Sequence, residues 1–224
     1  MIRREPNFLF LFAGMIVLIV TGPLVDTLFG RSAVIFAQVA LTALLLGGIL
    51  TLAQSRVGFR VGVVLVVASV GSTALAYVRP STPVTVVSFG VAWTFCLLSI
   101  VLCMRYVLTR GRVTPNHLVG VTCVYLLLGV LWGLMYAAIH VVDPTALRPA
   151  DASQALDLDD CLYFSFVTLT STGYGDILPT TRLVRTLAYL ESVAGQLYAA
   201  ILVATLVSRY VAPLPDAPER GGDS

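Results

Sequence analysis

The 224-residue sequence contains no lysine and little charge of either sign. Its 14 basic residues are all arginine, and charged residues make up 12% of the chain against 58% for hydrophobic ones. A soluble globular domain with so few charges would be hard to keep in solution. A net charge of +2, with no basic stripe interleaved with aromatic residues, argues against a nucleic-acid partner. The composition therefore predicts an integral membrane protein.

Residues that build disulfides, metal sites and catalytic centres are also scarce. The four cysteines are Cys96, Cys103, Cys123 and Cys161. They lie in or beside apolar runs and form no CxxC pair, so we expect small buried side chains. His117 and His140 stand at opposite ends of one apolar run, too far apart to cooperate in proton transfer. We therefore expect no enzyme activity, no catalytic residue and no cofactor.

Apolar runs long enough to cross a bilayer occur six times. A helix needs about 20 apolar residues to cross a hydrocarbon core of about 30 Å. The predicted spans are residues 8–28, 33–53, 58–78, 84–107, 117–141 and 183–208. The first run follows Arg3 and Arg4 as in a signal peptide, but no small-residue cleavage site comes after it, so we expect a retained first span. The expected fold class is an all-α membrane protein with six transmembrane helices.

The arginines, which lie between these spans or close to their ends, divide unequally between the two sides of the membrane. With the N-terminus inside, the inner arginines are Arg3, Arg4, Arg56, Arg60, Arg105, Arg110, Arg112, Arg209 and Arg220, and the outer ones are Arg31, Arg79, Arg148, Arg182 and Arg185. Because cytoplasmic loops carry an excess of Arg and Lys, this distribution predicts that both termini are cytoplasmic. Residues 142–182 then lie on the outer face.

The one long segment between predicted spans, residues 142–182, contains a short apolar run. Asp157, Asp159 and Asp160 precede the sequence CLYFSFVTLT, where an acidic side chain can cap a helix N-terminus. About 10 to 12 helical residues at ~1.5 Å each reach roughly half way through a bilayer. We therefore expect a re-entrant helix that ends at about Thr170 and returns as the strand STGYGD. Irregular backbone at that depth is tolerated where protein buries it or a water-filled path lines it.

This return strand offers oxygen atoms and no basic side chain. Ser171 supplies a hydroxyl, and the next three residues supply backbone carbonyls that, repeated around an axis, could replace the water shell of a cation. Glycine adopts positive φ without penalty, and Gly173 and Gly175 have the alternate spacing that turns successive carbonyls the same way. The negative end of the preceding helix dipole would also stabilise a cation.

The sequence TLTSTGYGD resembles the signature of the potassium channel family, TxTTVGYGD. The matching residues are Thr168, Thr170, Gly173, Tyr174, Gly175 and Asp176, while Ser171 and Thr172 replace the usual Thr and Val. The resemblance covers roughly residues 117–208 and implies an outer helix, a pore helix, a selectivity filter and an inner helix. It implies a filter of Ser171, Thr172, Gly173, Tyr174 and Gly175, with K+ held at the first four. It also implies supporting roles for Thr168, Thr170 and Asp176.

Several polar residues near this strand have two open interpretations. The resemblance implies that the Tyr174 ring packs outward as a spacer and that Asp176 bonds behind the filter, but Asp176 could also be a solvated turn acid. The three acids at 157, 159 and 160 could concentrate cations at the pore mouth, cap the helix, or do both. Ser171 keeps the hydroxyl of the innermost ion site, whereas the Thr172 hydroxyl needs a partner behind the filter.

Two residues of the last predicted span are candidates for roles in the inner helix. Glu191 could join a carboxylate ring in the cavity, but its place in the outer half of the span favours a polar contact with the pore helix or the fifth span. Gly195 could be the point at which the inner helix bends during gating, or a small residue that permits close helix packing.

The first four spans carry no such resemblance. A voltage sensor needs arginine at every third position inside a membrane helix, whereas the fourth span has none before Arg105, and Asp26 alone provides no countercharge network. We therefore expect weak or absent voltage gating. The expected domains are a four-helix N-terminal region (1–113), a pore domain (114–210) and a short cytoplasmic tail (211–224), which is too short to form a ligand-binding domain.

These inferences combine into one expected function, the passive and selective conduction of K+ across the cell membrane. One return strand cannot encircle an ion, so we expect a homotetramer whose partners are K+, its own copies and membrane lipid. Two alternatives stay open: a cation channel of relaxed selectivity, suggested by Ser171 and Thr172, and a non-conducting membrane subunit or adaptor.

Overall fold

The structure is a computed structural model that describes residues 8–29, 56–78, 81–109, 115–151 and 155–211. The helices are α1 (Phe8–Phe29), α3 (Arg56–Val78), α4 (Thr82–Thr109), α5 (Pro115–Val142), α6 (Leu158–Leu169) and α7 (Arg182–Val211), and the strands are β1 (Leu147–Pro149) and β2 (Ile177–Pro179). A helix occupies the place of every predicted span within these residues. The span predicted at 33–53, the side chain of Asp26 and the tail beyond residue 211 lie outside them.

The described residues contain three helical stretches that are long and apolar enough to cross a membrane. They are Thr82–Arg105 in α4, Asn116–Val142 in α5 and Arg182–Thr205 in α7. In α1, a shorter apolar stretch, Phe8–Val17, is also found. The helical membrane class is therefore supported by length and composition, while the count of six spans stays a prediction.

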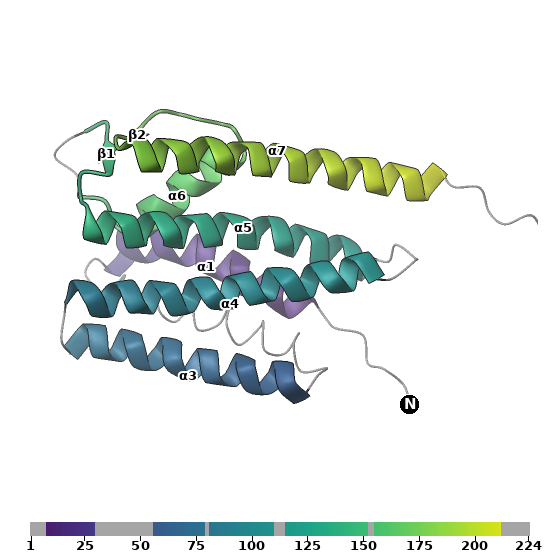
Figure 1. Ribbon diagram of the computed structural model, residues 1–224, viewed down its shortest axis with the longest axis horizontal. Coiled ribbons are helices and arrows are strands. Elements are labelled where there is room, and N and C mark those ends of the chain that lie inside the picture. The colour runs from purple at the N-terminus through teal and green to yellow at the C-terminus, as the bar shows by residue number, and fades with distance from the viewer. Residues whose placement is uncertain (1–7, 30–55, 79–80, 110–114, 152–154, 212–224) are drawn as a thin grey trace, which may run out of the picture.

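The long helices lie side by side in the order α3, α4, α5, α7 (Figure 1). α5 is the central one, because it contacts α1, α4, α6 and α7. α6 is short and packs against both α5 and α7 near the end of the bundle where the two strands lie. Proline stands at the first position of α5, Pro115, where its missing N–H leaves no helical hydrogen bond unmade.

The two strands form a small antiparallel sheet that closes the segment between α5 and α7. Leu147 pairs with Pro179, and Pro149 pairs with Ile177. The predicted outer segment, residues 142–182, therefore contains a pair of short strands that its sequence did not indicate. The sheet holds the chain before α6 next to the chain after the return strand, so the segment made of α6 and the return strand begins and finishes at the same end of the bundle.

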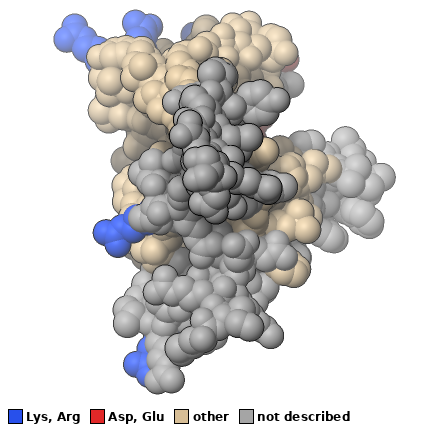
Figure 2. All heavy atoms as spheres, turned by 90° about the vertical axis from the view of Figure 1, so that its right-hand side faces the viewer, with Lys and Arg blue, Asp and Glu red and all other residues tan. Residues whose placement is uncertain are grey.

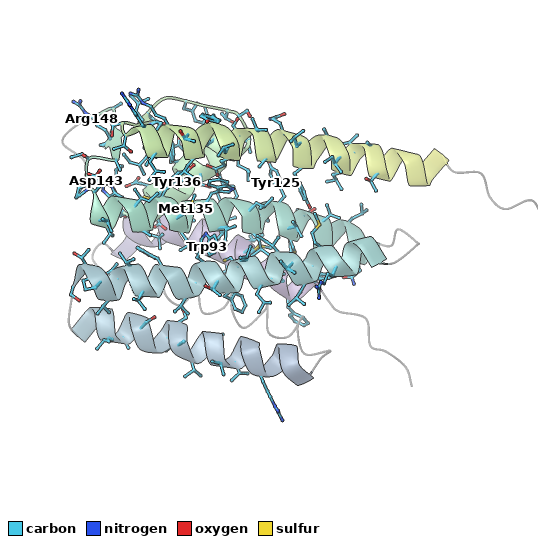
Figure 3. All side chains as sticks on the ribbon, viewed as in Figure 1. Trp93, Tyr125, Met135, Tyr136, Asp143 and Arg148 are labelled. Carbon is cyan, nitrogen blue, oxygen red and sulfur yellow. The ribbon has the colours of Figure 1, made fainter. Side chains whose placement is uncertain are left out.

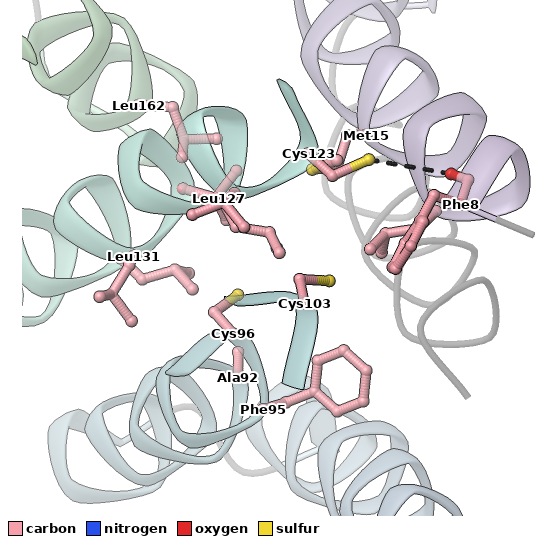
Figure 4. Packing of buried hydrophobic residues seen from close by; sticks show 14 residues of the cluster. Phe8, Met15, Ala92, Phe95, Cys96, Cys103, Cys123, Leu127, Leu131 and Leu162 are labelled. Atoms are coloured by element: carbon pink, nitrogen blue, oxygen red, sulfur yellow. Dashed lines mark hydrogen bonds between the residues drawn. The ribbon is translucent and has the colours of Figure 1, made fainter. Parts of the chain in front are cut away.

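The larger hydrophobic core lies between α1, α4 and α5 (Figure 4). Phe8 and Met15 from α1 belong to the same buried cluster as Phe95 and Cys103 from α4. Cys123 from α5 donates a weak hydrogen bond to the Phe8 carbonyl oxygen at 3.8 Å. All four cysteines are buried and free, which confirms the expectation of small apolar side chains. This core attaches the N-terminal helices to the helix on which α6 packs.

Among the described residues, basic side chains stand apart from one another when the bundle is viewed from the end far from the sheet (Figure 2). Figure 2 shows that end, where basic side chains project separately from the outline of the molecule and the described atoms between them are mostly uncharged. The described part of this face therefore has no continuous basic patch.

Candidate functional site

The short helix α6 begins with the acidic cap that the sequence predicts. Asp157 is the N-cap, and its carboxylate accepts a hydrogen bond from the Asp160 backbone N–H at 3.0 Å. The Asp160 carboxylate in turn accepts from the Asp157 N–H at 3.0 Å, which completes a capping box. The capping interpretation is confirmed for this pair.

The chain leaves α6 through a tight turn that is bonded back to the helix. Thr170 is the C-cap, one residue after the last helical residue, Leu169. The N–H groups of Thr172 and Gly173 both donate to the Val167 carbonyl oxygen, at 2.9 and 3.3 Å, and the Ser171 N–H donates to the Thr168 carbonyl oxygen at 2.9 Å. The start of the return strand is therefore fixed on the C-terminal end of α6.

The backbone of the return strand alternates in hand. Ser171, Gly173 and Gly175 have φ of 56°, 59° and 77°, whereas no other described residue has positive φ. Alternation at every second residue is the pattern that turns successive carbonyls toward one side, and glycine adopts it freely. The sequence predicted the two glycines but missed Ser171, whose side chain makes this conformation cost about 1 to 2 kcal/mol.

The strand is exposed on the single chain, and its carbonyl groups are available. Every residue from 170 to 176 is exposed, and Tyr174 keeps 72% of its surface accessible. Among the described residues, no donor bonds the carbonyl oxygens of residues 171–175. A run of free carbonyls with alternating backbone hand is an arrangement that can coordinate a dehydrated cation when several copies surround an axis.

Two hydroxyl groups of the strand have side-chain partners. The Thr172 hydroxyl lies 2.8 Å from that of Thr170, which supplies the partner that its position required. The Ser171 hydroxyl lies 2.8 Å from that of Ser192 and accepts from the Gln196 amide at 3.0 Å. Sequence reasoning missed Ser192 and Gln196, although polar residues four apart on an apolar helix were a usable signal.

Asp176 and Thr168 hold the strand at its two ends. The Tyr163 hydroxyl of α6 donates to the Asp176 carboxylate at 2.6 Å, and the Ala150 N–H donates to the Asp176 carbonyl oxygen at 2.7 Å. Asp176 is therefore bonded to the short helix, although its side chain is also exposed. Thr168 is half-buried on α6 and takes part through its backbone carbonyl.

Glu191 of α7 is fully buried against both α5 and α6. The Tyr136 hydroxyl of α5 donates to its Oε2 at 2.7 Å, and the Ser165 hydroxyl of α6 lies 2.5 Å from its Oε1. Figure 3 places Tyr136 on α5 near the sheet end, beyond Tyr125. The Tyr136 ring packs edge-on against Phe164, with centroids 5.0 Å apart. Of the two interpretations of Glu191, the structure has the polar contact, which joins it to the short helix α6 and to α5.

Gly195 marks the closest approach of α7 to α6. A Cβ atom at this position would lie 2.0 Å from the Leu169 carbonyl oxygen, which no real structure tolerates. The packing interpretation of Gly195 therefore describes this structure, and its role as a bending point stays a prediction. On α5, Gly129 and Gly133 play the same part, because a Cβ there would meet Phe166 and Leu162 of α6 at 2.4 and 2.6 Å.

The two histidines lie near opposite ends of α5, as predicted. His117 is buried in the first turn of α5 and His140 is half-buried in its last turn. Asp143, which follows α5, accepts from the Thr145 hydroxyl at 2.6 Å and from its N–H at 3.0 Å. These bonds from Thr145 hold the pKa of the Asp143 carboxyl below its ordinary value. The arrangement is a loop-stabilising turn at the end of the helix.

Comparisons with known proteins agree with the resemblance found in the sequence. Residues 121–212 match a family described as "Ion channel". Over 99 residues the chain is 30% identical to the inward rectifier potassium channel Kirbac3.1 of Paramagnetospirillum magnetotacticum, a match that covers 44% of this chain and 31% of that protein. The chain thus spans about a third of the length of this relative. No solved structure matches the chain. The match to the ion channel family falls on the part of the chain that contains most of α5, α6, the return strand and α7.

Proposed function

We propose that this chain forms a potassium-selective channel that conducts K+ passively across the cell membrane. The observation that carries the proposal is the return strand, in which positive φ at Ser171, Gly173 and Gly175 alternates with negative φ beside free carbonyl groups. The similarity of residues 121–212 to ion channels adds independent support. K+ is the expected ion because the strand carries the GYGD sequence and the relative is a potassium channel.

In this proposal α6 is a re-entrant pore helix. Its 12 residues give a length of about 18 Å, too short to cross a hydrocarbon core of about 30 Å. It packs on two longer apolar helices, so the non-helical backbone that follows it has protein on one side. The carbonyl end of its dipole would then face the middle of the membrane, where it stabilises a cation entering or leaving the filter.

The pore requires more than one copy of the chain. One return strand cannot surround an ion, and four copies about an axis are the arrangement that closes a ring of carbonyl groups. The exposed apolar surface of α7 is consistent with contacts to lipid and to neighbouring copies. It includes Leu183, Tyr189, Leu190, Val193, Leu197, Ile201 and Val203. The chain would therefore act as a homotetramer.

The rest of the chain is assigned by the same proposal. Residues 1–113 form a region that packs on α5 through α1 and α4, residues 114–210 form the pore domain, and residues 211–224 form a tail. Both termini face the cytoplasm, as the arginine distribution predicts. Arg105 is the one arginine in the sequence of α4, and it lies toward the end of that helix. We therefore expect conductance to change little with voltage; a steep voltage dependence in patch-clamp recordings would contradict this part.

Flux of K+ into liposomes, with a pair of glycine substitutions, tests the proposed function. Gly173 and Gly90 both have open space for a Cβ, but only Gly173 has positive φ, 59°. Gly173→Ala is therefore expected to abolish flux by distorting the strand, whereas Gly90→Ala, inside α4, should leave flux unchanged. No flux through the unaltered protein, or equal flux in both variants, would contradict the proposal and favour the non-conducting subunit.

The degree of selectivity needs its own measurement. Thr172 replaces the Val that is usual in the resembling family, and its hydroxyl bonds to Thr170 rather than lying free. We expect this bond to keep the strand rigid and the channel selective. Reversal potentials under opposed K+ and Na+ gradients decide this point, since equal permeability to both ions would favour the cation channel of relaxed selectivity.

A further inference from the structure

Glu191 belongs to a buried chain of oxygen atoms that crosses three helices. Its Oε2 accepts from the Tyr136 hydroxyl of α5 at 2.7 Å. Its Oε1 lies 2.5 Å from the Ser165 hydroxyl oxygen of α6, and that same oxygen lies 2.8 Å from the Gly129 carbonyl oxygen of α5. Glu191, Tyr136 and Ser165 have no exposed surface on the single chain. The position of each proton therefore depends on these neighbours and not on water.

The number of protons in this cluster is informative. A serine hydroxyl has one proton to donate, yet Ser165 faces two oxygen atoms at hydrogen-bond distance, and a carbonyl oxygen can only accept. If Glu191 were ionised, Oε1 would also only accept, so one of the two short contacts would lack a proton. If Glu191 is protonated, it donates to Ser165, and Ser165 donates to Gly129. Every contact then has a donor and an acceptor.

The charges around Glu191 lead to the same conclusion. The titratable groups that face it are Tyr136 and Tyr125, both on α5, and α6 presents the neutral Ser165. The acids of α6, Asp159 and Asp160, stand in the first turn of that helix. Within the described residues, no arginine or histidine is bonded to the Glu191 carboxyl. An ionised carboxylate buried in a membrane protein without a cation is costly, whereas a protonated one bonded to two hydroxyl groups, those of Tyr136 and Ser165, is not.

We propose that Glu191 is held as a neutral carboxylic acid and that its proton positions the pore helix. The donors run in one direction, from Tyr136 to Glu191, from Glu191 to Ser165, and from Ser165 to the Gly129 carbonyl oxygen. This series of hydrogen bonds joins α7 to α6 and both of them to α5. Its member on α6, Ser165, stands four residues before Leu169, after which the chain turns into the return strand. Glu191 is a positioning residue, since it acts on the strand through α6. This inference about ion conduction rests on the proposed function, but the protonation state does not.

Infrared spectroscopy of the full-length protein in liposomes tests the protonation state directly. Glu191→Gln is the matched variant, because the amide N–H can donate to Ser165 and the amide oxygen can accept from Tyr136, with no titratable proton. At neutral pH we expect a carboxylic acid C=O band in the unaltered protein that shifts in D₂O and is missing from Glu191→Gln. A band pattern unchanged by Glu191→Gln would overturn the proposal, as it would mean that Glu191 is ionised, with the Ser165 proton shared between two acceptors.

Stability and flux separate the positioning role from the mere presence of a proton. Glu191→Gln should keep the unfolding midpoint and retain K+ flux within about twofold, whereas Glu191→Ala and Glu191→Asp, which cannot reach both partners, should lower both. Ser165→Ala removes the acceptor of the proton and should shift the infrared band without removing it.

If Glu191→Gln is as unstable as Glu191→Ala, the proposal is wrong. If the unaltered protein shows the band but conducts no K+, the proposed function fails and the protonation state stands.

Discussion

The helices α5 and α7 are alike in length and apolar character but differ in how much of each the chain covers. Of the 18 most apolar consecutive residues in Asn116–Val142 of α5, 56% are buried by the rest of the chain. For the corresponding residues in Arg182–Thr205 of α7 the share is 11%. α5 has α1, α4, α6 and α7 as neighbours, while α7 has α5, α6 and β2. The single chain therefore completes the surroundings of one helix and leaves the other open.

This difference separates the helix contacts that form within one chain from the surface that stays uncovered on a single chain. In a bilayer, lipid is as apolar as leucine, so close packing and hydrogen bonds hold helices together rather than the hydrophobic effect. α7 has both kinds of contact on one face, through Gly195 and Glu191, and exposed apolar side chains on the rest. The return strand lies beside α7 and is also exposed. The incomplete surroundings of the two are consistent with an assembly of several copies.

The largest predicted effect is to break the close contact of α7 with α6. Gly195→Ala places a Cβ 2.0 Å from the Leu169 carbonyl oxygen, so one of the helices has to move. We expect a loss of about 3 kcal/mol in the free energy of unfolding, together with loss of K+ flux. Gly71→Ala is the control, because nothing lies within 4 Å of its Cβ. Unfolding in lipid nanodiscs measures both, and equal midpoints would show that α7 is not held at this point.

A pair of leucine truncations compares the two helices directly. Leu127 on α5 is fully buried, whereas Leu197 on α7 is 56% exposed. Leu127→Ala should cost about 2 kcal/mol or more by opening a cavity in the core between α1, α4 and α5. Leu197→Ala should cost little in a dissociated chain. If a second copy covers Leu197, its truncation lowers the fraction of tetramer, which native mass spectrometry measures in matched samples.

The helices were predictable from the sequence, but most of the side-chain contacts were not. Apolar runs bounded by Arg, Pro and Gly predict spans from local composition, and the acid pair at 157 and 160 predicts a cap within four residues. The partners of Glu191, by contrast, lie 26 and 55 positions away, on helices whose rotation about their own axes the sequence does not specify. The strand pairing of β1 with β2 was missed because three residues carry no periodic signal.

Substitutions of Ser171 in the exposed return strand are expected to have a smaller effect, because this residue has a left-handed backbone conformation. Its φ of 56° suits glycine, while its hydroxyl is held by Ser192 and Gln196. Ser171→Gly and Ser171→Ala both remove the hydroxyl, but only glycine relieves the backbone. We expect the glycine variant to be more stable than the alanine variant by about 1 kcal/mol. Both should reduce the permeability ratio of K+ to Na+, and identical unfolding midpoints would show that the residue is unstrained.

The smallest predicted effect separates the filter from the exposed surface of α7. Gln196→Leu removes the amide that donates to the Ser171 hydroxyl at 3.0 Å, a change worth about 1 kcal/mol or less in stability. Because the Ser171 oxygen then bonds to Ser192 alone, we expect a measurable change in the K+ to Na+ permeability ratio with almost no change in tetramer content. Leu197→Gln, one position along on α7, is the control that adds an amide without this contact. If both variants shift the reversal potential equally, the effect does not come from the hydrogen bond between Gln196 and Ser171, and this contact does not connect α7 to ion selectivity in the return strand.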